Sequence, residues 1–209
     1  YKDMLSTQGH PGVTRKFPHQ PGIDAAGVVE ECGNAHFKPG DEVIVTGYDL
    51  GMSTAGGLGQ YIRVPAEWVI PMPPGLSARE AMSYGTAGFT SALCIDKLLQ
   101  MGAAPGDGLV AVTGATGGVG VFAVSLLAKL GFEVAAATGK PESADMLRSL
   151  GAKEVYARQE LLDIKPPLAA PRFAHAVDAL GGEYLANLLT VIDYGGSVAC
   201  CGLAASPGL

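Results

Sequence analysis

The sequence predicts an α/β protein, with a doubly wound parallel sheet preceded by an antiparallel β domain, and three observations support this class. A glycine-rich turn at 114–120 stands between a β-branched run and an amphipathic helical pattern. From residue 109 onward, strand and helix patterns alternate, as in a parallel sheet. Before residue 90, short strand patterns are separated by turn residues, which is typical of an antiparallel domain or barrel.

Composition and charge exclude several classes of protein. The chain has 209 residues, of which 48% are hydrophobic and 16% charged, so a folded core in one large or two small domains is expected. The net charge is −6 and no basic cluster offsets it, which argues against a nucleic-acid partner. The longest mostly apolar run, 119–130, contains Lys129 and is too short to span a membrane, and we expect no secretory signal.

The four cysteines point to a reducing compartment. Cys32, Cys94, Cys200 and Cys201 show no CxxC spacing, so a metal site or redox pair has weak support. The adjacent Cys200 and Cys201 are expected to lie on opposite sides of a strand rather than to form a disulfide. We therefore expect a cytoplasmic protein.

The N-terminal part, residues 1–90, is expected to form the antiparallel domain. Residues 1–21 have no clear period and indicate a loop with a short helical turn. A turn signal at 38–41 and five glycines between 47 and 59 separate the strand patterns. We expect strands at 28–33, 42–46, 60–64 and 68–70.

A helix is expected to open at Ser77, because Ser77 and Glu80 have the spacing of a capping box. Gly85 and Gly88 are expected to interrupt this helix, which then resumes at 89–101. The composition shifts at this point, so we place the boundary between the two domains at about residue 90, with 91–209 as the second domain.

The second domain is expected to contain five parallel strands joined by helices. The strand patterns lie at 109–113, 132–137, 153–156, 173–178 and 195–200, and the helix patterns at 118–130, 143–150 and 183–192. Right-handed βαβ connections place such strands in one sheet. Dinucleotide-binding sheets commonly have about six strands. Because a sixth strand is missing and Tyr1 is not preceded by Met, we expect the chain to be part of a longer one.

The turn at 114–120 indicates a ligand. Gly114, Gly117 and Gly120 have the spacing of a dinucleotide-binding turn, in which glycines permit a tight turn, close approach of a pyrophosphate and close helix packing. The alternative is a tight loop without a ligand. Four residues are expected to direct backbone N–H groups at the pyrophosphate: Thr116, Gly117, Gly118 and Val119.

The residues after the second strand of this domain favour NADP over NAD. An NAD site commonly has Asp or Glu there, about 20 residues beyond the glycines, to bind the ribose hydroxyls. The chain instead has Thr138, Gly139 and Lys140, and a hydroxyl, an N–H and a cation suit the 2′-phosphate of NADP. Arg158, after the third strand, is expected to add a second cation. The alternative for Lys140 is an ordinary solvated lysine.

The glycine pattern also occurs in short-chain dehydrogenases. Residues 113–120 fit their Thr-Gly-x-x-x-Gly-x-Gly signature, which leaves a short-chain-type carbonyl reductase as an alternative. Two features oppose it. The motif follows 112 residues rather than lying near the N-terminus, and neither Tyr156 nor Tyr184 belongs to a Tyr-x-x-x-Lys pair.

An N-terminal β domain followed by a dinucleotide-binding domain, over nearly the whole chain, resembles the medium-chain dehydrogenase/reductases, in which a GroES-like domain precedes a Rossmann domain. Residues 21–29 resemble the Pro-Gly-x-Asp/Glu-x-x-Gly segment of this superfamily, and residues 38–43 resemble its Gly-Asp-x-Val strand opening. Zinc alcohol dehydrogenases have His-Glu in the first segment, whereas this chain has Ile23 and Asp24, and the four-cysteine zinc loop is absent. The resemblance therefore implies the zinc-free branch of quinone oxidoreductases and enoyl reductases.

Shorter strings resemble the acryloyl-CoA reductase subgroup: 1–3, 85–90, 112–120 and 199–204. This resemblance implies that the chain lacks both ends, namely the Asn of an Asn-Tyr-Lys-Asp motif before Tyr1 and the return segment after a sixth strand. It implies NADPH-dependent hydride transfer to the β-carbon of an alkene conjugated to a carbonyl, followed by protonation of the α-carbon. The implied substrate is a small molecule, such as acryloyl-CoA, an enone or a quinone, and the implied assembly is a homodimer.

Several residues outside the glycine turn are candidates for the site. Tyr1 is the candidate catalytic residue, because its phenol can donate to a carbonyl or relay a proton; the alternative is a packed ring. Thr86 is expected to hydrogen-bond the nicotinamide side of the cofactor or to cap a helix. Three residues that end the fifth strand are expected to contact the cofactor: Cys201, Gly202 and Leu203.

The alternative to an enzyme is a non-catalytic, crystallin-type protein that binds NADPH.

Three other polar residues are expected to have structural roles. Asp3 is expected to tie the N-terminal loop. His175 lies within a buried strand pattern, where a hydrogen-bonded core histidine is the common case. Asp178 ends the same strand near the cofactor edge.

Overall fold

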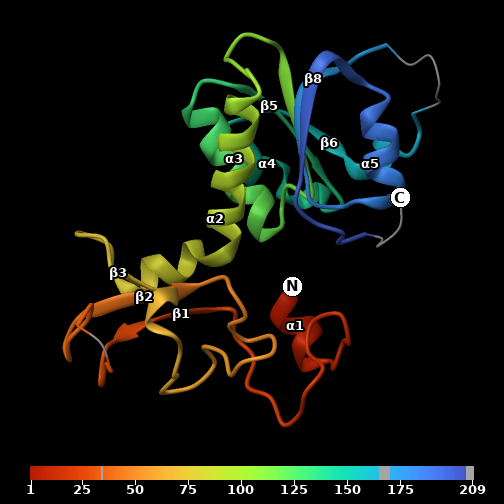
Figure 1. The fold of residues 1–209 in the computed structure, drawn as a ribbon. Helices are drawn as coiled ribbons and strands as arrows, with labels where there is room; N and C mark the ends of the chain where they lie inside the picture. The colour runs from red at the N-terminus through yellow and green to blue at the C-terminus, as the bar shows by residue number, and fades with distance from the viewer. Residues whose placement is uncertain (34, 165–169, 206–209) are drawn as a thin grey trace. The chain divides into compact units, whose positions relative to one another are not determined.

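The computed structural model describes residues 1–33, 35–164 and 170–205. The chain forms two compact units, Tyr1–Thr86 and Ala87–Leu209. The first unit contains a three-stranded antiparallel sheet and the second a five-stranded parallel sheet (Figure 1). This is the α/β class that the sequence predicts.

The first unit is built around one short sheet. Strand β2 (Glu42–Thr46) pairs with β1 (Asp24–Val28) on one side and with β3 (Val69–Pro71) on the other. Helix α1 (Lys2–Thr7) precedes the sheet, and the 3₁₀ helix η1 (Ala66–Trp68) leads into β3.

Two strand predictions in this unit are wrong. The first strand lies at β1 and not at 28–33, because its ladder with β2 ends at the pair of Val28 and Glu42. Beyond this pair, Val29 hydrogen-bonds residues 40 and 41 of the turn at 38–41. Residues 61–64 alternate between exposed and half-buried positions, but residues 60–64 pair with no strand in the described part of the chain. Alternating burial therefore does not by itself make a strand, which also needs a hydrogen-bonding partner.

Helix α2 (Ala78–Gln100) begins with the predicted capping box, in which the Ser77 hydroxyl and N–H donate to Glu80 Oε2 at 2.6 and 2.9 Å. The helix is broken at Gly85, where φ is +47° and ψ is −156°. The second predicted interruption is wrong, because Gly88 keeps helical angles. An isolated glycine costs a helix only about 1 kcal/mol and does not by itself break it.

The second unit has the order β6-β5-β4-β7-β8. Three helices connect the strands: α3 (Gly118–Lys129), α4 (Ala144–Ser149) and α5 (Gly182–Leu189). Two short 3₁₀ helices, η2 (Pro141–Ser143) and η3 (Arg158–Leu161), follow β5 and β6. The strands are β4 (Leu109–Thr113), β5 (Glu133–Thr138), β6 (Ala152–Ala157), β7 (Phe173–Asp178) and β8 (Ile192–Cys200).

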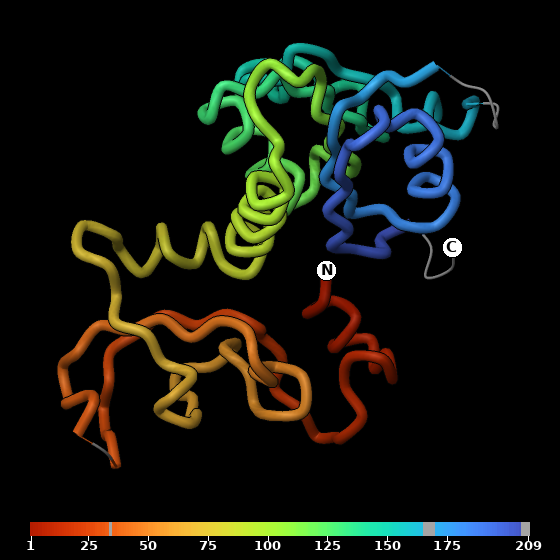
Figure 2. The backbone as a smooth tube through the Cα atoms, turned by 45° about the horizontal axis from the view of Figure 1, so that its top comes forward, coloured from red at the N-terminus to blue at the C-terminus, as the bar shows by residue number. Residues whose placement is uncertain are grey.

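Both faces of the parallel sheet are buried. Val110 and Val112 face one core, together with residues of α2, α3 and α4, whereas Ala111 faces a second core with Leu188 of α5. Figures 1 and 2 show α3 and α4 on one side of the sheet and α5 on the other. The alternation of adjacent strand residues between two cores makes this sheet doubly wound, as predicted. None of the described helices combines the length and apolar character needed to cross a bilayer.

The turn from β4 into α3 depends on close backbone packing. A Cβ atom on Gly120 would lie 2.3 Å from the Gly114 carbonyl oxygen and 2.5 Å from the Ala115 Cα, so only glycine fits there. Gly114 has φ of +59°, and its carbonyl accepts the Gly117 N–H at 2.8 Å. The first turn of α3 therefore lies directly against the end of β4.

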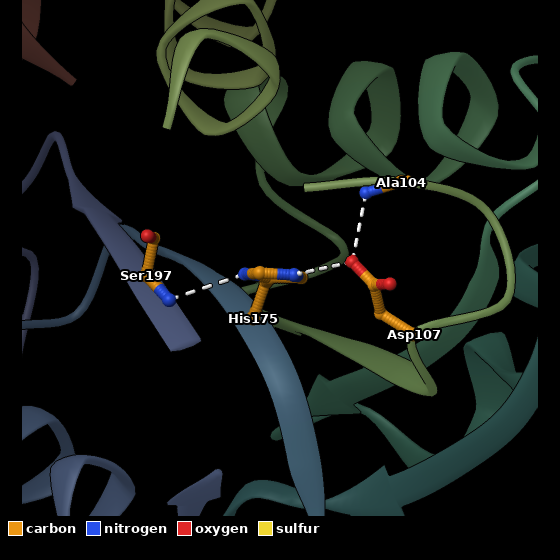
Figure 3. Close-up of polar contacts among 4 residues, drawn as sticks. All are labelled: Ala104, Asp107, His175 and Ser197. Carbon is orange, nitrogen blue, oxygen red and sulfur yellow. Dashed lines mark hydrogen bonds and ion pairs between the residues drawn. The ribbon is translucent and has the colours of Figure 1, made fainter. Parts of the chain in front are cut away.

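The buried His175 has both ring nitrogens hydrogen-bonded (Figure 3). The Ser197 N–H donates to His175 Nδ1 at 3.1 Å, so Nε2 carries the proton and donates to Asp107 Oδ2 at 3.1 Å. The same carboxylate oxygen accepts the Ala104 N–H at 2.8 Å. His175 thus joins β7 and β8 to the turn before β4, which confirms its predicted structural role.

We predict that Asp107 contributes to stability in a pH-dependent way. The Ala104 N–H and then His175 hold the pKa of the Asp107 carboxyl below its usual value. A lowered folded-state pKa stabilises the protein above the unfolded-state value of about 3.9, and the effect is lost as pH falls through the folded-state value. In urea unfolding, Asp107→Asn should therefore have a lower free energy of unfolding than the original chain at neutral pH. This difference should shrink below about pH 4.

The exposed Asp163 provides the control. Asp163→Asn should unfold like the original chain at every pH. An Asp107→Asn deficit that stayed constant from pH 7 to pH 3 would contradict the prediction.

We also predict that Gly120→Ala destabilises the second unit by about 1–3 kcal/mol, the usual cost of forcing a methyl group into a packed site. Gly27→Ala is the control, because a Cβ atom there meets nothing within 4 Å. Urea unfolding of both variants measures the difference. Equal midpoints for Gly120→Ala and the original chain would show that the turn relaxes freely.

Candidate functional site

The predicted cofactor residues of the second unit gather at one edge of the parallel sheet. Because the five strands are parallel, their carboxyl ends lie at the same edge, where open α/β sheets bind ligands. Each segment that carries predicted residues follows a strand end: 114–120 follows β4, 138–140 closes β5, 158 follows β6 and 201–203 follows β8.

The glycine turn has the features of an anion site. Helix α3 is 12 residues long and has no acidic residue in its first turn. The N–H groups of Gly118 and Val119 have no acceptor within the helix, as at any helix start. The N–H of Gly117 already donates to the Gly114 carbonyl inside the turn, so the prediction that it points at the pyrophosphate is wrong. Gly117 instead permits close approach, because it carries no side chain.

Thr138 connects the glycine turn to the end of β5. Its side chain is buried, with 2% of the residue exposed. Its Oγ1 accepts the Lys140 N–H at 3.0 Å and lies 3.1 Å from Thr116 Oγ1. The hydroxyl of Thr138 therefore holds Thr116 and Lys140 in place.

Two cations lie beside this end of β5. Lys140 and Arg158 are exposed, and neither forms an ion pair with another described residue. The Arg158 side chain lies against Gly139, where a Cβ atom would be 2.8 Å from Nε. No carboxylate occupies the end of β5, so the positive charges are available to an anion.

A buried carboxylate positions the segment after β8. Asp178 is 0% exposed; its Oδ1 accepts the Thr113 hydroxyl at 2.5 Å, and its Oδ2 accepts the Gly181 N–H at 2.9 Å. The Asp178 carbonyl accepts the Cys201 N–H at 2.8 Å, which fixes the start of 201–203. The structural role predicted for Asp178 is confirmed. The sequence did not reveal its partner Thr113, although both are polar residues that end neighbouring strands.

Cys201 is a thiol at neutral pH. A hydrogen bond with Cys94, and then burial, raise the pKa of the Cys201 thiol above its usual value. A group that stays protonated is a poor nucleophile, so the structure gives Cys201 a packing and contact role rather than thiolate chemistry.

In the first unit, Asp24 organises the predicted residue Thr86. Asp24 Oδ1 accepts the Thr86 N–H and hydroxyl, both at 2.8 Å, and also the Thr46 hydroxyl. A Cβ atom on Gly85 would lie 2.9 Å from Asp24 Oδ2, so the carboxylate occupies the space that the helix break opens. Sequence reasoning placed Asp24 in a motif but did not identify this contact, which spans 62 positions of the chain.

Asp3 and Tyr1 also belong to the first unit. Asp3 Oδ1 accepts the N–H groups of Gly22 and Ile23 at 3.0 and 2.9 Å, which confirms its predicted role in tying the N-terminal loop. Tyr1 precedes α1 and is 70% exposed, so its ring is not packed into a core. Among the described residues, no group of three or more His, Cys, Asp or Glu side chains is arranged to hold a metal ion.

Comparison with known proteins identifies the family. Residues 1–74 match the alcohol dehydrogenase GroES-like domain, and residues 118–208 match the zinc-binding dehydrogenase family. The acrylyl-CoA reductase of Ruegeria pomeroyi is 50% identical over 210 residues, which cover 100% of this chain and 64% of that protein.

Solved structures agree with this match. The yhdH oxidoreductase from Salmonella enterica, in complex with NADP, has a TM-score of 0.94 at 44% identity, covering 100% of this chain and 65% of its own. The yhfP protein of Bacillus subtilis, with NAD bound, has a TM-score of 0.93 at 48% identity and the same coverage. The chain thus spans less than two thirds of the length of these relatives. With both domains matched in this order, the chain belongs to the medium-chain dehydrogenase/reductase family and is similar to its acrylyl-CoA reductases.

Proposed function

We propose that the protein containing this chain is an NADPH-dependent oxidoreductase that reduces a C=C bond conjugated to a carbonyl. Its substrate is a 2-enoyl-CoA such as acryloyl-CoA, an enone or a quinone, and its hydride transfer needs no zinc. The observation that carries the proposal is the presence of two cations, Lys140 and Arg158, beside a glycine turn at the carboxyl edge of the sheet. Neither cation forms an ion pair with another described residue. Relatives named as acrylyl-CoA reductase and quinone oxidoreductase support the reaction class.

The residues at the sheet edge fit the dinucleotide. The space left by Gly117 and the free donors at the start of α3 suit a pyrophosphate, with Thr116, Gly118 and Val119 supplying backbone N–H groups. Lys140 and Arg158 neutralise the 2′-phosphate, and Thr138 positions Lys140. Solved relatives bind NADP or NADPH in two cases and NAD in one. The absence of an acidic residue at the end of β5 favours NADPH here.

The remaining site residues position the reactants and supply a proton. NADPH supplies the hydride. Thr86, held by Asp24, hydrogen-bonds the nicotinamide side of the cofactor, and residues 201–203 contact the cofactor after β8. The Tyr1 phenol donates to the substrate carbonyl or relays the proton to the α-carbon. Ile23 and Asp24 stand where zinc alcohol dehydrogenases have His-Glu, which supports a reaction without zinc.

We further propose a cytoplasmic homodimer. Strand β8 forms an edge of the parallel sheet, and Tyr194 on this strand is fully exposed. An exposed aromatic ring of this kind suits contact with a second copy. Sedimentation of the full-length protein tests the assembly.

We predict that removing either cation weakens NADPH binding and leaves NADH binding unchanged. A hydrogen bond to a charged group is worth enough that Lys140→Ala and Arg158→Ala should each raise the Kd of NADPH about ten-fold. Lys129→Ala, an exposed lysine at the far end of α3, is the control. Equal affinity for NADPH and NADH, unchanged in both variants, would refute NADP recognition.

We predict that the full-length protein oxidises NADPH when acryloyl-CoA, crotonyl-CoA or a quinone is added, and that Tyr1→Phe slows this turnover without changing the Kd of NADPH. Loss of NADPH absorbance measures the rate. Cofactor binding without oxidation by any of these acceptors would instead support a non-catalytic, crystallin-type protein.

A further inference from the structure

We infer that Tyr184 is a positioning residue, which holds the Arg158 guanidinium at the end of β5 so that it recognises the 2′-phosphate of the cofactor. This inference rests on the proposed function and adds a residue that contacts neither substrate nor phosphate. Three features of the second unit carry it: the ring beneath the guanidinium, the glycine beside it, and the absence of a competing carboxylate among its described residues.

The first feature is the geometry of the ring. Tyr184 lies in the first turn of α5, and Arg158 opens η3, which contacts α5. The guanidinium carbon of Arg158 lies over the Tyr184 ring, 5.8 Å from its centroid, within the range of a cation–π interaction. Tyr184 is half-buried and packs against the core that contains Phe173 and Leu188. The ring is therefore a fixed surface for a long side chain that would otherwise have many rotamers.

The second feature is Gly139. A Cβ atom at this position would lie 2.8 Å from Arg158 Nε and 3.1 Å from both Cδ and Cζ. Any side chain here would push the guanidinium away from the end of β5, because the flexible arginine would move before the strand. Glycine at position 139 thus leaves space for the Arg158 side chain.

The third feature is charge. A carboxylate could also orient an arginine, but it would neutralise the charge and occupy the N–H donors. Glu160, two positions on, instead accepts the Ala157 N–H at 2.9 Å, and no described carboxylate pairs with Arg158. An aromatic ring orients the guanidinium while its N–H groups and its charge remain directed to a phosphate.

The experiment compares the affinities of NADPH and NADH, measured by titration of the purified protein. Tyr184→Leu should reduce the NADPH preference by about two- to five-fold, the range expected for an exposed cation–π contact. Tyr184→Phe keeps the ring and should keep the preference. Gly139→Ala displaces Arg158 without changing Tyr184 and should reduce the preference as well.

A ring with only a packing role gives a different pattern, in which Tyr184→Leu lowers Tm and weakens both cofactors equally. Arg172 provides a matched control, because its guanidinium carbon lies 4.8 Å from the centroid of a different ring, that of Tyr156, and its backbone precedes β7 at the amino end of that strand. Arg172→Leu should leave the preference unchanged.

The outcomes separate the two proposals. If Arg158→Ala lowers the NADPH preference but Tyr184→Leu and Gly139→Ala do not, Tyr184 has no positioning role and the proposed function stands. If Arg158→Ala leaves the preference unchanged, the role of Tyr184 is overturned, whereas recognition of NADPH through Lys140 still stands. If the protein binds neither cofactor, both the recognition of NADPH and the role of Tyr184 are overturned.

Discussion

The close approach of Gly120 to the Gly114 carbonyl is the constraint on which the candidate cofactor site depends. Because no side chain separates them, the first turn of α3 begins directly at the end of β4. The unpaired N–H groups and the positive end of the helix dipole are thereby brought to the carboxyl edge of the sheet. A single methyl group at this point would move the helix, and the anion site would move with it.

Around that turn, polar side chains at the strand ends form hydrogen bonds with other residues of the fold. Thr113 and Asp178 join β4 to β7, and the Thr138 hydroxyl joins the turn to Lys140. These contacts satisfy the buried polar groups, as a stable fold requires. The long cations Lys140 and Arg158 are the exception, since neither has a carboxylate partner among the described residues. The paired polar side chains make the carboxyl edge of the sheet rigid, while the two cations leave it with positive charge that attracts a phosphate.

The first unit uses a carboxylate in a comparable way. Asp24 accepts two hydrogen bonds from Thr86 and one from Thr46, and it lies beside the positive-φ Gly85. The helix is therefore broken where a distant strand supplies a better set of hydrogen bonds. Gly88, three positions on, remains helical.

The sequence by itself determined the elements whose signals are local. Strands β4 and β7 begin and end at the predicted residues, because apolar runs there are bounded by turn residues. The family motifs and the predicted cofactor segments could also be read directly, since each follows a strand end. Tertiary structure decided what depends on distant partners. The Asp24–Thr86 and Thr113–Asp178 contacts span 62 and 65 positions, and residues 60–64 lack the partner that a strand needs. Periodicity records which side of an element is buried, whereas a hydrogen bond between distant residues exists only once the chain has folded.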